Sequence, residues 1–218
     1  MPAKIIAFSN QKGGSGKTTT CCQVAGTLGQ RGTKVLVIDA DPQGTAVRWA
    51  ASAPDDQPFP ATVVGLGAAG SKVHQQVKRF VDDYAFILID CPPSVESPHT
   101  QSALLIGDLA VCPLIPSPTD LWATAGFQKL VEMVEPLNPA LQARLLATMC
   151  QSTNLAKNAL EVLETFGIPL LKTRLGLRTA YRQSAAWGSV VVNQGHEARA
   201  AAVEINALLD ELLKLLEA

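Results

Sequence analysis

The stretch Lys12-Gly13-Gly14-Ser15-Gly16-Lys17-Thr18-Thr19 decides the fold, because both its composition and its neighbours are specific. The apolar run 4–10 precedes it and has the length of a strand, and the proline-free run 20–30 follows it and is typical of a helix. A strand, a glycine loop and a helix in this order form the context of a phosphate-binding loop. We therefore expect this loop to hold a phosphorylated ligand.

Each residue type in the loop suits that chemistry. Gly13, Gly14 and Gly16 lack a Cβ atom, so the backbone can turn tightly and aim its N–H groups at phosphate oxygens. The N-terminus of the following helix adds a partial positive charge. Lys17 is placed to reach the β- and γ-phosphates, and the Thr18 hydroxyl is placed to bind Mg²⁺. We expect residues 12–19 to bind the phosphates of a nucleotide.

Length and composition restrict the class of protein. The 218 residues are enough to bury roughly 70% of the unfolded surface in a sizeable core. The formal net charge of −1 means that binding to any polyanion requires a local basic patch. The five cysteines include no C-x-x-C pair, which favours reduced, mostly buried thiols in the cytosol. No signal peptide and no apolar run of transmembrane length are recognisable.

The order of apolar runs predicts a single α/β domain over residues 1–218. Further strands are expected at 34–41, 86–90, 109–115, 144–149 and 168–173. Helices are expected at 45–53, 71–83, 98–106, 121–135, 156–166 and 197–217. The strand runs are continuously apolar, as in strands covered on both faces. Alternation of strand and helix predicts a mostly parallel, twisted sheet with helices on both faces.

Aspartates close two of the predicted strands, at the edge where open α/β sheets bind ligands. Asp39 and Asp41 follow the run Val37-Ile38, and Asp90 follows Ile87-Leu88-Ile89. A carboxylate at the end of a buried strand is costly to desolvate, and a nearby Mg²⁺ compensates that cost. These three aspartates are candidates for the metal side of the site. For each taken alone, a solvated or helix-capping aspartate is the alternative.

The loop departs from the plain G-x-x-x-x-G-K-[ST] pattern. Gln11 stands in place of the first glycine, and an additional lysine, Lys12, opens the loop. This variant resembles the deviant Walker A motif of the ParA/MinD family of ATPases. The resemblance implies a P-loop NTPase fold that binds ATP or ADP with Mg²⁺. It also implies an ATP-dependent homodimer in which Lys12 reaches the nucleotide of the partner.

The same resemblance implies a role for each site residue. Thr18, Asp39 and Asp90 belong near Mg²⁺, with Asp90 as the Walker B aspartate, and Asp41 orients or activates the attacking water. Lys12, Lys17 and Asp41 are then the catalytic residues of a phosphoryl-transfer site. The reaction is hydrolysis of ATP to ADP and phosphate, slow and stimulated by a partner protein.

A tract without any Asp or Glu, residues 165–196, carries the cations Lys172, Arg174, Arg178 and Arg182. Several cations together neutralise backbone phosphates without reading sequence. The tract resembles the ParA region that holds arginines for nonspecific DNA binding, although Leu177 stands where that region has a proline. The alternative is that these cations are solvated and pair with acids elsewhere in the chain.

The C-terminal run helps to distinguish a ParA-type protein from a MinD-type protein that binds membranes. Leu208, Leu212, Leu215 and Leu216 form an apolar stripe, and the charges around it are three acids and one lysine. A negative membrane surface repels such a helix, so we expect it to pack against the sheet and expect no membrane partner. The three tryptophans (Trp49, Trp122 and Trp187) are expected in the core or at an interface.

The sequence therefore predicts a small ParA-type ATPase that is cytoplasmic and nucleoid-associated. It would bind DNA nonspecifically and position a plasmid, chromosome or protein cargo with a ParB-like or cargo adaptor protein. One alternative is a MinD-like membrane-associated regulator. Another is a metabolic or iron–sulfur P-loop relative, although Cys91 and Cys112 show no evident cluster motif.

Overall fold

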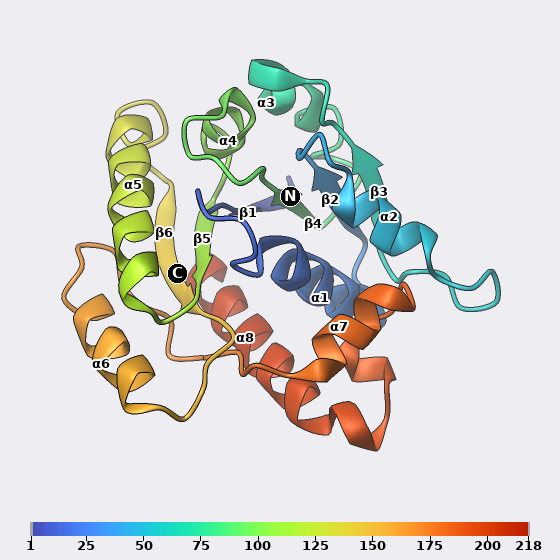
Figure 1. The fold of residues 1–218 in the computed structure, drawn as a ribbon. Coiled ribbons are helices and arrows are strands. Elements are labelled where there is room, and N and C mark those ends of the chain that lie inside the picture. The colour runs from blue at the N-terminus through green and yellow to red at the C-terminus, as the bar shows by residue number, and fades with distance from the viewer. Residues whose placement is uncertain (1, 218) are drawn as a thin grey trace.

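A six-stranded sheet organises the chain in the computed structural model, which describes residues 2–217 and, within them, all side chains except those of residues 118, 119, 121 and 123. The strands are β1 (Lys4–Phe8), β2 (Val35–Asp39), β3 (Thr62–Gly65), β4 (Phe86–Asp90), β5 (Leu109–Leu114) and β6 (Gln142–Ala147). Their order is β3-β2-β4-β1-β5-β6, and every paired strand is parallel to its neighbour (Figure 1). The predicted parallel α/β sheet is confirmed.

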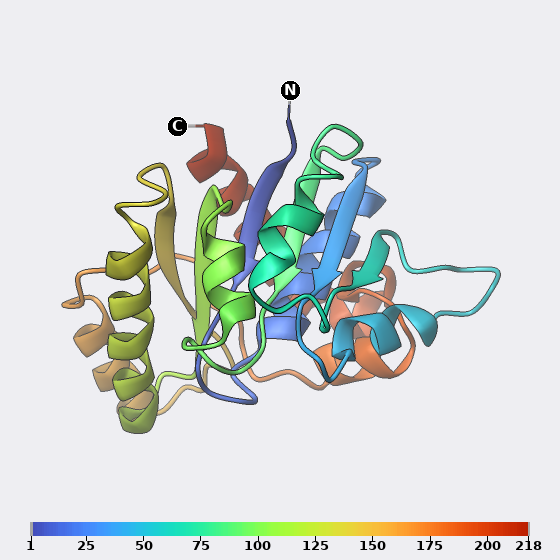
Figure 2. The same cartoon turned by 90° about the horizontal axis from the view of Figure 1, so that it is seen from above.

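Helices lie on both sides of this sheet (Figure 2). They are α1 (Lys17–Gln30), α2 (Thr45–Ala51), α3 (Val73–Val77), α4 (Pro98–Leu104), α5 (Pro118–Val134), α6 (Asn154–Leu163), α7 (Thr179–Ala186) and α8 (Arg199–Glu217). Short 3₁₀ turns cover Gly70–Lys72, Val191–Asn193 and His196–Ala198. The crossovers between parallel strands therefore build a layer of helices on each face.

Two hydrophobic cores result, one on each face of the sheet. Successive residues of a strand point to opposite faces, so β1 sends Ile6 and Phe8 into one core and Ile5 and Ala7 into the other. The first core is covered by α1, α2, α7 and α8, and the second by α3, α4, α5 and α6. This double coverage explains why the strands are apolar throughout rather than alternating.

Some predicted elements differ from the structure. The run 168–173 is not a strand and makes only an isolated bridge, between Leu170 and Leu145. Pro169 has no N–H to donate, and the N–H groups of Lys172 and Thr173 donate instead to the carboxylate of Glu211. The helix predicted at 71–83 ends at Val77 and continues as turns.

Two elements were not predicted at all. The edge strand β3 is only four residues long, and its first and last residues are exposed. The helix α7 lies inside the acid-free tract 165–196. Both are short, and neither carries an apolar run strong enough to stand out.

The C-terminal helix packs as predicted. The side chains of Leu208 and Leu212 on α8 are fully buried, and Leu215 and Leu216 are partly buried against the same core. On the outer side, Arg31 after α1 pairs with Asp210 of α8 at 2.8 Å. In the part of the chain that the structure describes, no helix is long and apolar enough to cross a bilayer.

The cysteines and tryptophans divide by burial. The thiols of Cys21, Cys22, Cys91 and Cys112 are buried and that of Cys150 is half-buried, and all five are free, so the predicted burial of thiols is confirmed. Trp49 is a core residue, whereas Trp122 and Trp187 are 76% and 55% exposed. Those two tryptophans are therefore not in the core, and their predicted place at an interface stays a prediction.

A close approach of α1 to the connection before β3 gives a first testable prediction. A Cβ atom on Gly29 would lie 1.9 Å from the carbonyl oxygen of Pro60, which is backbone and cannot rotate away. Gly29→Ala is expected to lower the free energy of unfolding by about 1–3 kcal/mol, measured by urea denaturation. The control is Gly107→Ala, whose Cβ would lie 3.3 Å from the flexible Leu141 side chain and no closer than 3.6 Å to any backbone atom outside its two chain neighbours. Equal effects of the two substitutions would contradict this explanation.

Candidate functional site

The glycine loop lies at the carboxyl edge of the sheet, between β1 and α1. Gly14 and Gly16 have φ angles of 74° and 93°, which side-chain-bearing residues rarely adopt, so glycine is required at both. Asn10 anchors the start of the loop, since its amide donates to the carbonyl of Pro113 at 2.7 Å and its side-chain oxygen accepts from the N–H of Lys12 at 3.0 Å. The loop is thus held open above the N-terminus of α1, as a phosphate-binding loop requires.

Lys17 stands inside this loop. Its side chain is 7% exposed, and its ammonium donates to the carbonyl oxygen of Lys12 at 3.1 Å. Burial lowers the pKa of Lys17, although the nearby Asp90 carboxylate acts in the opposite direction. A desolvated ammonium on a glycine-rich loop is well placed to attract phosphate oxygens.

Thr18, Asp39 and Asp90 come together at the ends of adjacent strands. The hydroxyl of Thr18 donates to Oδ2 of Asp90 at 2.6 Å, and Asp39 is the register partner of Asp90 across β2 and β4. Burial raises the pKa of Asp90 to about 7, against the hydrogen bond from Thr18. Burial also raises the pKa of Asp39, which accepts from the backbone N–H groups of Val47 and Asp41.

These groups fit a magnesium ion. Oδ1 of Asp90 is buried and has no hydrogen-bond partner among residues 2–217, so one acceptor at the sheet edge is unsatisfied. Within the described chain no three His, Cys, Asp or Glu side chains can hold a metal by themselves. Magnesium in phosphoryl-transfer sites takes one or two carboxylates, with waters and substrate phosphates completing the octahedron. The site offers that incomplete set. Asp41 lies at its outer rim and accepts from the N–H of Gln43 at 2.9 Å.

Lys12, the additional lysine of the loop, points toward α5. Its ammonium pairs with Oδ2 of Asp120 at 2.7 Å, and Ser117 donates to the same oxygen. Asp120 is 1% exposed, whereas the Lys12 side chain is 41% exposed. Gln11 also lies against this helix, because a Cβ on Gly126 would come within 2.6 Å of its side-chain oxygen. The start of the loop is therefore attached to α5.

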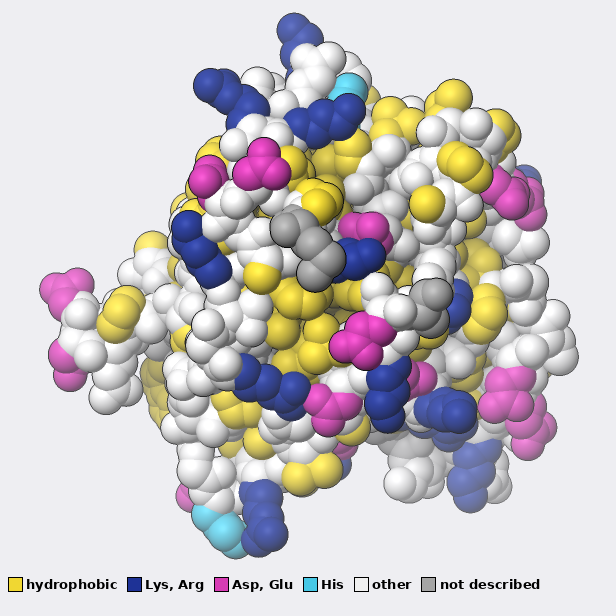
Figure 3. All heavy atoms as spheres, turned by 180° about the vertical axis from the view of Figure 1, so that it is seen from behind, with side chains coloured by type: hydrophobic (Ala, Val, Ile, Leu, Met, Phe, Trp, Pro, Cys, Tyr) yellow, Lys and Arg dark blue, Asp and Glu magenta, His cyan; other side chains and the backbone are white. Residues whose placement is uncertain are grey.

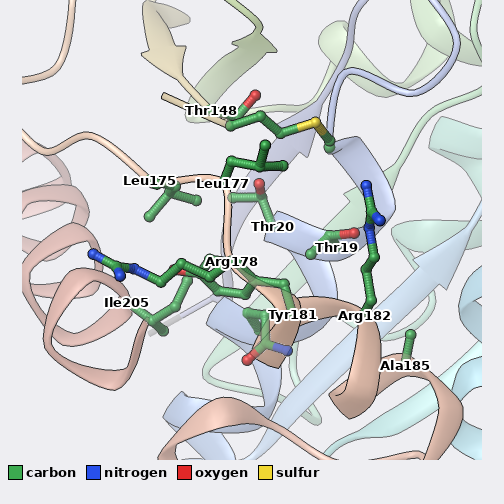
Figure 4. A pocket seen from close by; sticks show the side chains of 14 residues that line it. Thr19, Thr20, Thr148, Leu175, Leu177, Arg178, Tyr181, Arg182, Ala185 and Ile205 are labelled. Carbon is green, nitrogen blue, oxygen red and sulfur yellow. The ribbon is translucent and has the colours of Figure 1, made fainter. Parts of the chain in front are cut away.

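A cavity of about 250 Å³ adjoins the loop on the side of α1 (Figure 4). Thr19 and Thr20 form one wall, and Leu175, Leu177 and Arg182 are among the residues of the other. The hydroxyl oxygen of Thr20 is buried and, in the part of the chain that the structure describes, has no hydrogen-bond partner. No local sequence pattern marks this cavity, because the residues that line it come from separate parts of the chain, from Gly16 to Ile205.

The four predicted DNA-binding cations lie in different environments. The side chain of Arg178 is paired with Glu204 at 2.6 Å, and that of Arg174 with Glu164 at 3.9 Å. Arg182 is exposed, and within residues 2–217 its guanidinium makes no ion pair. Lys172 is exposed beside Glu211, which its N–H contacts. Figure 3 shows the side of the molecule turned away from the viewer in Figure 1, where basic and acidic side chains are interspersed.

Comparison with known proteins defines the class. Residues 6–191 match the model of the CobQ/CobB/MinD/ParA nucleotide binding domain. Since this match covers most of the chain, the protein belongs to that family of P-loop ATPases, as the loop sequence predicted.

Two relatives illustrate the match. The chain is 33% identical over 214 residues to the "Maintenance of carboxysome distribution protein A" of Halothiobacillus neapolitanus, covering 97% of each chain. It is 31% identical over 200 residues to the "Chromosome partitioning protein ParA" of Myxococcus xanthus, covering 72% of this chain and 69% of that protein.

Solved structures share the fold. Apo McdA of Cyanothece superposes with a TM-score of 0.81 at 17% identity, covering 96% of this chain and 99% of that one. The cell division ATPase MinD of Pyrococcus furiosus superposes with a TM-score of 0.73 at 23% identity, covering 98% and 99%. These two likenesses concern architecture alone. The iron–sulfur alternative is disfavoured by burial, because Cys91 and Cys112 are 1% and 0% exposed and do not reach a surface where two subunits could share a cluster.

Proposed function

We propose that this protein is an ATP-switched positioning ATPase that binds DNA nonspecifically and distributes a cargo with the help of a partner protein. The full-length match to a carboxysome distribution protein carries this proposal, because it covers 97% of both chains. A large protein assembly is accordingly the proposed cargo, and a plasmid or a chromosome is the alternative cargo. The proposed location is the cytoplasm, on the nucleoid.

In this proposal the site residues divide the work of ATP hydrolysis. Lys17 and the backbone N–H groups of residues 13–19 would bind the phosphates, and Thr18, Asp39 and Asp90 would hold Mg²⁺. When bound, Mg²⁺ supplies positive charge that stabilises phosphoryl transfer. Asp41, at the rim, orients the attacking water.

The cavity beside α1 is the proposed place of the nucleoside. It begins at Gly16 and Thr19, where the phosphate-binding loop ends, and it is largely apolar, as base pockets are. The unsatisfied hydroxyl of Thr20 is available to a polar group of the ligand. Triphosphate and nucleoside thus lie along one continuous path over the N-terminus of α1.

Dimerisation follows from Lys12 in this proposal. Its side chain is half-exposed at the edge of the loop, where a second copy of the chain would approach. Lys12 then works in the manner of an arginine finger on the nucleotide of the partner, so that ATP joins two chains and hydrolysis releases them.

DNA attachment tests the proposal. Wild-type protein with ATP is expected to bind unrelated duplexes equally well, with an affinity that falls steeply with salt. At saturating ATP, Arg174→Ala and Arg182→Ala are each expected to reduce the slope of log affinity against log salt by about 1, measured by fluorescence anisotropy. The control is Arg79→Ala, an exposed arginine beyond the tract. Unchanged slopes would place the DNA surface elsewhere, and equal binding to anionic liposomes would favour the membrane-associated alternative.

A further inference from the structure

One carboxylate on α8 holds a whole segment of the cavity wall. Oε1 of Glu204 accepts from Nε and Nη2 of Arg178 at 2.9 and 2.6 Å. Oε2 of Glu204 accepts from the N–H of Gly176 at 3.1 Å and from the hydroxyl of Tyr181 at 2.9 Å. Four donors from six consecutive residues therefore converge on a single side chain. We call Glu204, Arg178, Tyr181 and Gly176 the Glu204 clamp.

The clamp lies directly behind the cavity. Gly176, Arg178 and Tyr181 all line it, and so does Ile205, the residue next to Glu204. In Figure 4 the Arg178 side chain runs away from the loop toward α8, whereas Arg182 stands beside Thr19. Hydrogen bonds to Glu204 thus attach part of the cavity wall to α8.

Charge and burial make this arrangement stable. The guanidinium of Arg178 meets Glu204 through two N–H groups, a geometry that fixes both partners. Its hydrogen bond to Glu204 raises the pKa of Arg178 further. Tyr181 is 8% exposed, and its pKa is raised by burial, so its hydroxyl keeps its proton and remains a donor. Loss of the carboxylate would deprive the buried hydroxyl of Tyr181 of its shorter hydrogen bond, which is costly.

We propose that Glu204 is a positioning residue for the nucleoside end of the ATP site, and that Arg178 serves this clamp rather than DNA. This inference rests on the proposed placement of the nucleoside in the cavity. Arg178 fits the role because two of its donors already bind Glu204. A clamp that shapes only the nucleoside pocket affects the binding of ATP and leaves the binding of a bare triphosphate unchanged.

The test compares ATP with inorganic tripolyphosphate by isothermal titration calorimetry. Glu204→Gln is expected to weaken ATP binding about tenfold, as expected for loss of a charged hydrogen bond, and to change tripolyphosphate binding less than about twofold. Arg178→Ala is expected to weaken ATP binding to a similar extent. Arg178→Lys is expected to lose less affinity for ATP, because lysine keeps one charged donor. The matched control is Glu164→Gln, which removes the exposed partner of Arg174. If Glu204→Gln lowered the affinities for ATP and for tripolyphosphate equally, the proposed role of Glu204 at the nucleoside end would be wrong.

A second variant separates the clamp from the placement of the nucleoside. Ala185→Phe fills the cavity from α7 and is expected to weaken ATP but not tripolyphosphate. If Ala185→Phe weakens ATP binding while Glu204→Gln binds ATP normally, the nucleoside does lie in the cavity, but the positioning role of Glu204 is wrong. If neither variant affects ATP, the nucleoside lies elsewhere and both are wrong. Arg178→Ala is also expected to keep the DNA salt slope of the wild type at saturating ATP, and a slope reduced by about 1 would return Arg178 to the DNA surface.

Discussion

Lys17→Ala is expected to reduce the affinity for ATP with Mg²⁺ on the order of 100-fold or more, which is the usual cost of removing one partner from a buried charged contact. The reason is the position of its ammonium, which is almost fully buried in the loop and whose only hydrogen bond within residues 2–217 is to the carbonyl oxygen of Lys12. Neither water nor a neighbouring side chain can replace a charge at that depth. Isothermal titration calorimetry measures the effect.

The stability of the ligand-free Lys17→Ala protein tests whether the loss of ATP affinity is specific. Burial lowers the pKa of Lys17, so its charged form is desolvated at a cost to the free protein. Removing it is therefore expected to leave the ligand-free protein folded, with a thermal unfolding midpoint close to that of the wild type. A Lys17→Ala protein that binds ATP within about threefold of the wild type would contradict the assigned role.

The second large effect concerns assembly. Lys12→Ala is expected to retain ATP binding and to lose ATP-dependent dimerisation, because it removes the side chain proposed to reach the second subunit and leaves the phosphate-binding groups in place. Light scattering after size exclusion, with ATP and with a non-hydrolysable analogue, distinguishes monomer from dimer. A variant that dimerises like the wild type would refute a role for Lys12 across the interface.

The ion pair between Lys12 and Asp120 requires a companion variant. Lys12→Ala leaves the carboxylate of Asp120, which is 1% exposed, without its cation, and an uncompensated buried charge destabilises the fold. Lys12→Ala/Asp120→Asn removes that charge and restores stability. If the double variant is as stable as the wild type and still monomeric with ATP, the loss of dimer belongs to Lys12 itself. If it dimerises, the single variant failed only through instability.

The loop, the sheet and the strand-end aspartates could be predicted because each is a local pattern. Glycines and Lys17 fall between an apolar strand and a helix, and Asp39 and Asp90 end apolar runs whose parallel pairing brings them side by side. The strand predicted at 168–173 was wrong because apolarity alone does not reveal that Pro169 lacks a donor. In the same segment the N–H groups of Lys172 and Thr173 find an acceptor in Glu211, thirty-nine and thirty-eight residues away.

The cavity and its clamp could not be predicted in the same way. Arg178 and Glu204 are separated by 26 residues, and nothing local marks them as partners. A count of charges over residues 165–196 treats every cation as available, whereas two of the four predicted cations are ion-paired within the chain. Contacts across the fold decide whether a cation is ion-paired, since Arg178 meets Glu204 on α8 and Arg174 meets Glu164 at the end of α6.

The acids of α8 have a consequence for engineering the chain. Composition alone places them in solvent, yet Glu204 and Glu211 accept backbone N–H groups of the preceding tract, and Asp210 holds Arg31. A replacement helix with the same leucines but lysines at these three positions would still cover the sheet. It would leave the tract that borders the cavity untethered, so the far end of the polypeptide governs the shape of a site encoded near its beginning.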